Sequence, residues 1–236
     1  NGAEPRPITL ATHGSRLLPA MGRPDRHDLL GAWNYYHRPN EPRGGLVCFP
    51  RTDPSSALLF GDMVRLHYRT SPDDPQLHHF QGTYTAVDFC DLTGDGSTSI
   101  VFADQGGSDI GFFTNTGERD GAGAPIFLKA AVLDLADQME AQQRTDGRLF
   151  TVASLQAVDF DGDGRFALIV NGLLIRAGNG RWPFEPAWPA IDLGCGGEVV
   201  MLDVRGDGRP HAFGIRCEGA PGEAFGLNLR GIEGQC

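Results

Sequence analysis

AVDFDGDGRFALIV, residues 157–170, joins an acidic turn to an apolar run. Asp159, Asp161 and Asp163 stand at alternate positions, and Gly164 follows them. Calcium in proteins takes about six to eight hard oxygen ligands, so alternating carboxylates on a glycine-bearing turn suit it. The residues FALIV that follow indicate a strand, whereas an EF-hand loop is followed by a helix. The stretch therefore predicts a calcium loop that leads into a β-strand.

Two further stretches repeat this pattern. AVDFCDLTGDGSTSIVF (86–102) and VMLDVRGDGRPHAFGI (200–215) each contain an apolar run, an aspartate, Gly-Asp-Gly, a few polar residues and a second apolar run. MGRPDRHDLLGAW (21–33) is a fainter copy that keeps the strand but has lost the acidic loop. The repeat predicts strand starts, spaced 71, 68 and 44 residues apart, at Asp28, Ser99, Ala167 and His211.

These repeats divide the chain into four units of irregular length within a single domain of residues 1–236. The units cover approximately residues 8–56, 57–132, 145–190 and 191–236. Between the strand starts lie short apolar segments bounded by Gly, Pro, Asn or Asp, which predict β-strands. LDLADQMEAQQR (133–144) predicts one helical insertion. Many short strands with turn residues are typical of all-β sandwiches and propellers, and the repeat favours a β-propeller.

The stretches VDFDGDGRFALIV and CDLTGDGSTSIVF resemble the FG-GAP/VCBS type of repeat, which is found in integrin-like β-propellers and in many secreted microbial proteins. The resemblance implies blades that each carry a Ca²⁺ loop between their first two strands. It implies ligands at the first, third, fifth and ninth loop positions and a backbone carbonyl at the seventh. Repeats of this type usually build seven blades, so four units imply an incomplete ring, unrecognised blades or a ring completed by another chain.

The three loops match this ligand pattern to different degrees. The third unit offers Asp159, Asp161 and Asp163, but Ala167 stands at the ninth position. The second unit offers three oxygen-bearing side chains, with Ser99 at the ninth position, and the fourth unit has Arg205 at the third position. The three oxygen-bearing residues of the second unit are Asp91, Thr93 and Asp95. The alternative is a tight turn in which aspartates accept hydrogen bonds from backbone amides.

Composition excludes some classes of function. The net charge is −10, with 30 acidic and 20 basic residues, and this acidic balance argues against nucleic acid as a partner. No stretch is apolar for the roughly 18 residues that a membrane span needs. A start at Asn1 without Met fits a processed chain, so we expect a secreted or cell-surface protein. The five cysteines lack CxxC spacing, and they predict either one disulfide near the C-terminus or buried free thiols.

The residues that favour a functional site lie in the first third of the chain. Six of the seven histidines and all four tyrosines precede residue 85. The stretches DLLGAWNYYHRPNEPRGG (28–45), VRLHYRT (64–70) and LHHFQGTY (77–84) carry most of them. The candidates for substrate binding are Trp33, Tyr35, Tyr36 and Arg38, and the candidates for catalysis are His37, Arg65, His67 and Tyr68. The alternative is that such large side chains fill the space between blades.

Two kinds of function use these residue types. A glycan-binding surface stacks aromatic rings on sugars and holds acidic groups with Arg. A polysaccharide lyase uses Arg to neutralise a uronate carboxylate and Tyr or His to move protons, and some ulvan-type lyases are β-propellers with a similar set of residues. Strand alternation places Arg65 and His67 on one face and Tyr68 on the other, which disfavours a single cleft for all three.

A glycan- or partner-binding module is therefore the expected function, and a lyase that acts on uronate-bearing polysaccharides is the alternative. A third hypothesis is an adhesion or filament subunit, in which open strand edges pair with a protein partner. The stretch WPFEPAW (182–188) predicts either a second sugar platform or aromatic packing between blades, and we favour the packing.

Overall fold

A computed structural model describes thirteen segments of the 236-residue chain. The described residues are 16–20, 23–33, 45–50, 60–80, 85–104, 108–137, 152, 154–159, 165–179, 182–193, 199–202, 211–218 and 226–232. Apart from the two helical residues Ala136 and Asp137, the elements they form are strands, so the all-β prediction is confirmed. No described helix is long and apolar enough to cross a membrane.

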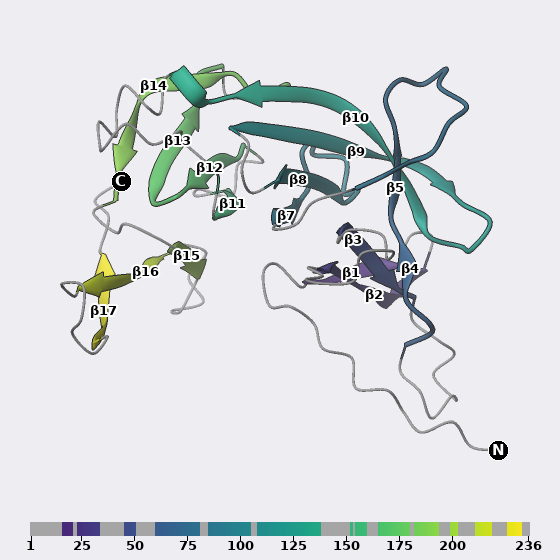
Figure 1. Cartoon of the computed structure of the whole chain (residues 1–236), viewed down its shortest axis with the longest axis horizontal. Helices are drawn as coiled ribbons and strands as arrows, with labels where there is room; N and C mark the ends of the chain where they lie inside the picture. The colour runs from purple at the N-terminus through teal and green to yellow at the C-terminus, as the bar shows by residue number, and fades with distance from the viewer. Residues whose placement is uncertain are drawn as a thin grey trace, which may run out of the picture.

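The strands form four sheets, shown in Figure 1. The first has the order β1 (Arg16–Ala20), β2 (Arg23–Trp33), β3 (Gly45–Phe49), β4 (Val64–Arg65). The second has the order β6 (His78–His79), β5 (His67–Arg69), β10 (Pro125–Asp134), β9 (Asp109–Arg119), β8 (Ser99–Asp104), β7 (Thr85–Cys90). The third has the order β11 (Leu155–Val158), β12 (Ala167–Val170), β13 (Leu173–Ala177), β14 (Pro186–Asp192). The fourth has the order β15 (Val199–Leu202), β16 (His211–Glu218), β17 (Gly226–Ile232).

The repeated turns lie between the first two strands of successive sheets. Ser99, Ala167 and His211 are the first residues of β8, β12 and β16, and they pair with the last residues of β7, β11 and β15. These three predicted strand starts are confirmed. Asp28, in contrast, lies inside β2, which begins at Arg23. The strand start predicted from the faint copy at residues 21–33 is therefore five residues too late.

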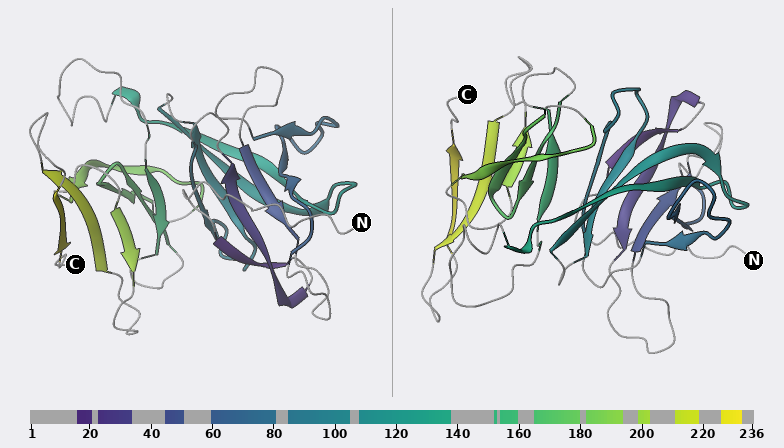
Figure 2. Two further views of the ribbon diagram at one scale, coloured as in Figure 1. Left: turned by 60° about the horizontal axis from the view of Figure 1, so that its bottom comes forward. Right: turned by 90° about the horizontal axis from the view of Figure 1, so that it is seen from above.

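The second sheet lies between the first and the third (Figure 2), and it shares a buried core with each of them. Strand β8 shows why, because Ile100 belongs to the core shared with the first sheet and Val101 to the core shared with the third. Successive side chains of a strand point to opposite faces, so a run of apolar residues serves both cores. The first strands β7 and β11 contact each other, as do β11 and β15.

One extended segment belongs to two sheets. Val64 and Arg65 pair with β3 as the edge of the first sheet, and His67 to Arg69 pair in parallel with β10 of the second. Leu66 lies between them, is fully buried, and donates its amide to the carbonyl of Leu46 at 2.9 Å. The segment therefore holds the outer edges of the two sheets together and positions the β5–β6 hairpin on the second.

The region of the expected helix is described only in part. Leu133 and Asp134, its first two residues, belong to β10, and Asp134 pairs with Asp109. Ala136 and Asp137 are helical, and residues 138–144 lie outside the described residues. The prediction of a helix from residue 133 is wrong at its start, because pairing with β9 keeps the chain extended through Asp134.

Candidate functional site

The short β5–β6 hairpin brings four of the ring-bearing side chains together. Its register places His67 opposite His79 and Tyr68 opposite His78. The ring centroids are 4.4 Å apart in the first pair and 5.5 Å apart in the second. Directly opposite side chains share one face of a sheet, so the histidine pair lies on one face and the Tyr68 pair on the other. The predicted placement of His67 and Tyr68 on opposite faces is therefore confirmed.

A pocket of about 270 Å³ opens beside this hairpin, and every side chain that lines it has an aromatic ring. Phe80 and Phe113 are buried, and their rings meet at 66° with centroids 4.8 Å apart. Tyr68 lies 4.9 Å from Phe80 and 5.0 Å from Phe113. The lining residues are Tyr68, His78, His79, Phe80, Phe102 and Phe113. The inclined rings offer both faces and edges, which suits a ligand with an apolar side and polar groups around it.

Acidic side chains stand beside the basic ones on the outer face of the hairpin. Nδ1 of His67 lies 2.9 Å from Oδ2 of Asp120, and the two side chains are 18% and 7% exposed. This contact is an electrostatic one, because the ring nitrogen is not aligned for a hydrogen bond. Nη2 of Arg69 lies 2.9 Å from Oε2 of Glu118. The hairpin β9–β10 therefore supplies the counter-charges for β5.

Two groups in the pocket have perturbed pKa values. Burial lowers the pKa of His79, and the neighbouring His67 and Arg65 lower it further. Burial raises the pKa of the Tyr68 phenol. At neutral pH the His79 imidazole is therefore uncharged and the Tyr68 hydroxyl keeps its proton. Both groups can exchange hydrogen bonds with a polar ligand without carrying a charge.

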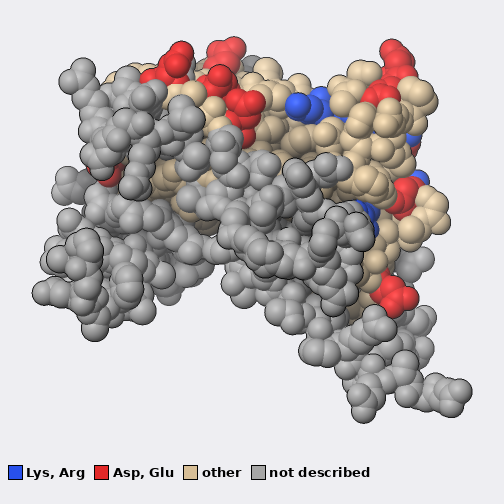
Figure 3. All heavy atoms as spheres, viewed as in Figure 1, with Lys and Arg blue, Asp and Glu red and all other residues tan. Residues whose placement is uncertain are grey.

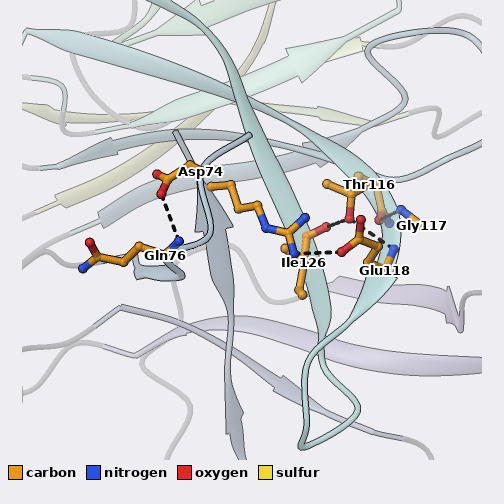
Figure 4. A network of polar contacts seen from close by, with 8 residues as sticks. Asp74, Gln76, Thr116, Gly117, Glu118 and Ile126 are labelled. Carbon is orange, nitrogen blue, oxygen red and sulfur yellow. Dashed lines mark hydrogen bonds and ion pairs between the residues drawn. The ribbon is translucent and has the colours of Figure 1, made fainter. Parts of the chain in front are cut away.

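Asp74 organises the loop between β5 and β6. Its carboxylate accepts hydrogen bonds from the Thr70 hydroxyl at 2.5 Å and from the Gln76 amide at 2.9 Å, the latter drawn in Figure 4. His78 Nε2 lies 3.1 Å from the same carboxylate. These donors, the Thr70 hydroxyl first among them, hold the pKa of Asp74 well below its usual range. The loop therefore fixes the ring of His78 at the rim of the pocket.

The β9–β10 hairpin, also drawn in Figure 4, is held by its own polar contacts. The Thr116 hydroxyl donates to the carbonyl of Ile126 at 2.7 Å and accepts the amide of Glu118 at 3.1 Å. At the tip, Asp120 accepts the amides of Ala122 and Ala124, both at 2.9 Å. The carboxylates of Glu118 and Asp120 are therefore anchored beside β5.

The second repeated turn is folded around the carboxylate of Asp91. One oxygen accepts the amide of Gly94 at 2.7 Å and that of Asp95 at 3.2 Å, and the other accepts the amide of Gly96 at 2.7 Å. Gly94 and Gly96 have φ angles of 74° and 80°, which L side chains rarely adopt. Thr93 places its hydroxyl 3.5 Å from the same carboxylate. The turn therefore has the alternative form, in which an aspartate carboxylate accepts hydrogen bonds from backbone amides.

Oxygen atoms suited to calcium remain around this turn. The Asp95 carboxylate accepts the amide and the hydroxyl of Ser97, which lower its pKa and keep it ionised. Ser99, at the ninth loop position, is 0% exposed, and its hydroxyl has no hydrogen-bond partner among the described residues. A buried hydroxyl without a partner is costly, and a bound cation would satisfy it. Within the described ranges no three His, Cys, Asp or Glu side chains converge as a metal site, so hydroxyl and carbonyl oxygens would have to contribute.

The other predicted residues are described only in part. Asp159 follows β11 and is exposed, whereas its partners Asp161 and Asp163 lie outside the described residues. Trp33 ends β2, with only its backbone described. The remaining first-unit candidates also lie outside the described residues, namely Tyr35, Tyr36, His37 and Arg38.

The candidate list missed most of the pocket. His78 and His79 lie in a stretch that the sequence analysis singled out for its histidines. Their pairing opposite Tyr68 and His67 was not predicted. Phe102 and Phe113 carry no local signal that separates them from other apolar strand residues. Arg65 and His67 do not line the pocket, whereas Tyr68 does.

The stretch at residues 182–188 packs between sheets, as we favoured. Phe184, in the loop before β14, stacks on Phe166 at 5.3 Å and on Phe112 of β9 at 5.9 Å. Trp182 meets Phe112 edge-on at 5.3 Å. These rings close the core between the second and third sheets.

No protein-family model, no curated protein and no solved structure matches this chain.

Proposed function

We propose that this protein is a calcium-stabilised module of the β-propeller type that acts outside the cell and binds glycans at the aromatic pocket beside β6. Successive, mainly antiparallel sheets support the propeller arrangement, with the strands β7, β11 and β15 in contact from one sheet to the next. The pocket carries the proposal of glycan binding. Its walls are all rings, and His78 and His79 add polar atoms at the rim.

A sugar ring has one apolar face and hydroxyl groups around its edge. The apolar face would lie on the inclined rings of Tyr68, Phe80 and Phe113, which form one continuous cluster. The hydroxyl groups would exchange hydrogen bonds with the imidazoles of His78 and His79. A pocket of about 270 Å³ has room for one sugar unit, so the module would bind a chain end or a side branch.

Calcium has a structural role in this proposal. In the second unit Asp91, Thr93 and Asp95 would hold the ion. The hydroxyl of Ser99, which has no partner among the described residues, supports a ligand at the ninth position. A bound cation would stabilise the turn between β7 and β8. The third unit would use Asp159 and the two aspartates that follow it at alternate positions.

The test is a binding titration of the full chain against a panel of glycans, followed by calorimetry. Replacing Tyr68 by Ala removes one ring of the pocket and would weaken binding by about 1 kcal/mol or more, which is about fivefold in the dissociation constant. Val132→Ala removes an exposed apolar side chain from the same sheet and serves as the control. If no glycan in the panel binds although the protein is folded, the proposal is rejected.

The lyase remains a second candidate because of one observation. Tyr68 and His79 line the same pocket, and the pKa shifts leave a neutral imidazole beside a protonated phenol. An imidazole of this kind can take the proton next to a uronate carboxylate, and a phenol can protonate the leaving oxygen. An unsaturated uronate absorbs ultraviolet light, so its appearance on incubation with uronate polysaccharides would favour the lyase. Tyr68→Phe would then abolish turnover but keep binding.

A further inference from the structure

We infer that the glycan bound at this pocket is an acidic one, that Arg65 and His79 hold its carboxylate, and that binding takes up a proton. This inference rests on the proposed glycan-binding function and adds the chemical class of the ligand.

The first step is the gathering of basic side chains beside the pocket. His79 lies opposite His67 with ring centroids 4.4 Å apart, and Arg65 precedes His67 by two residues on the segment that joins the two sheets. The influence of Arg65 on the pKa of His79 places the guanidinium within electrostatic reach of this imidazole. Three basic groups from β4, β5 and β6 therefore lie near one another, and His79 among them lines the pocket.

The second step is the distribution of counter-charges. His67 lies beside Asp120, Arg69 beside Glu118, and His78 beside Asp74. Among the ion pairs of the described segments, none includes His79, although it is the exposed histidine that lines the pocket. A ligand carboxylate would give His79 the kind of acidic partner that its basic neighbours already have. Acidic side chains stand at several places on the described part of the face seen in Figure 3, so a local basic site is needed to attract an anion.

The third step is the linkage between ligand and proton. The pKa of His79 is lowered in the free protein by partial burial and by His67 and Arg65, whereas Asp120 and Asp74 contact His67 and His78. A bound carboxylate opposes these effects and favours the protonated imidazole. The complex therefore binds a proton that the free protein lacks at neutral pH, and affinity rises as pH falls.

The experiment compares short oligomers of galacturonic acid with their methyl esters, which keep the sugar and lose the charge. Binding to the full chain is measured by calorimetry at about pH 7.5 and about pH 5.5, on either side of the usual range of a histidine. The acid should bind more tightly than the ester, and its dissociation constant should fall about fivefold or more at the lower pH. Uronate carboxylates stay ionised at both values, so the change reports on the protein.

Three variants identify the groups, and thermal melting checks that each is folded. His79→Gln should remove the pH dependence of the affinity, and Arg65→Gln should weaken binding of the acidic oligomer at both pH values. Arg176→Gln removes an exposed positive charge from β13 of the third sheet and should change neither.

The outcomes separate this inference from the proposed function. An ester that binds as tightly as the acid, or pH dependence that survives in His79→Gln, would overturn the inference while glycan binding stands. If the acid, the ester and the wider glycan panel all fail to bind, the proposed function fails as well.

Discussion

The carboxylate of Asp88 accepts a hydrogen bond from the backbone amide of Ala157, 2.8 Å away, although 69 positions separate the two residues. Its other oxygen accepts the amide of Phe89 at 2.9 Å. Asp88 is only 3% exposed and belongs to β7, whereas Ala157 belongs to β11. The Asp88 carboxylate therefore joins the first strands of two sheets. A buried carboxylate is stable only when it is hydrogen-bonded, as this one is.

Replacing Asp88 by Asn should destabilise the fold. The amide side chain has one acceptor oxygen, so its NH₂ group would face one of the two backbone N–H donors. We expect a loss of about 1–3 kcal/mol in the free energy of unfolding, measured by urea denaturation. Asp62→Asn changes the same group on an exposed residue and should have little effect. Equal stability of the two variants would show that the Asp88 contact contributes nothing.

Gly45 at the start of β3 should not tolerate a side chain. A Cβ added there would collide with the backbone carbonyl oxygen of Phe80, which cannot rotate away as a side chain can. Gly45→Ala should therefore cost about 1–3 kcal/mol, the usual range for overpacking. Gly121→Ala is the matched control, because nothing lies within 4 Å of its added Cβ. Thermal melting of both variants would measure the difference, and a stable Gly45→Ala would contradict the close approach.

The Ser99 hydroxyl should lower the stability of the protein without calcium and raise it when calcium is bound. Without calcium, Ser99→Ala removes a buried group that has no described partner, and stability should rise by up to about 1 kcal/mol. With calcium, the wild-type chain should gain more stability than the variant, because the variant lacks one oxygen ligand. Melting temperatures in chelator and in excess calcium would measure both effects.

Ser108→Ala is the control for this comparison. Its hydroxyl donates to Asp134 at 3.1 Å, away from the repeated turn, so the gain from calcium should match that of the wild type. A Ser99→Ala variant that keeps the full gain would exclude Ser99 as a ligand.

Stability should decline at alkaline pH because of Cys48. Burial, with a further contribution from the carboxylate of Asp28, raises the pKa of this free thiol from its ordinary value of 9.0 to about 12. Above about pH 9 the thiol of the unfolded chain loses its proton, whereas the folded chain keeps it. The free energy of unfolding should therefore fall by up to about 1.4 kcal/mol per pH unit between these two values. Cys48→Ala should lose that part of the slope in urea denaturation between about pH 8 and about pH 11.

The repeated turns could be predicted because their signal is local. Gly-Asp-Gly fixes a turn, and pairing begins at the same distance after it in β8 and β12, with Ser99 opposite Cys90 and Ala167 opposite Val158. The amide-capping role of Asp91 also follows from local chemistry. The copy at residues 21–33 has no such turn, and there the predicted strand start was wrong.

The pocket could not be predicted because it depends on pairing between distant segments. His67 to Arg69 pair in parallel with Ile126 to Leu128, and no periodicity in either segment specifies this register. Phe102 and Phe113 belong to the same apolar alternation as the rest of the core, so their place at a pocket follows only from the position of the hairpin.

The segment from Val64 to Arg69 has a consequence for how the protein opens in solution. Its amides are divided between two sheets, and the fully buried Leu66 stands at the point of division. If the first sheet separated from this segment, Leu66 would be exposed and the support for β5 beside β10 would be lost. Local opening usually follows such cooperative units. The amides of β3 and of the β5–β10 pairing should therefore exchange with deuterium at one common rate, and a glycan bound at the hairpin should slow exchange in both sheets together.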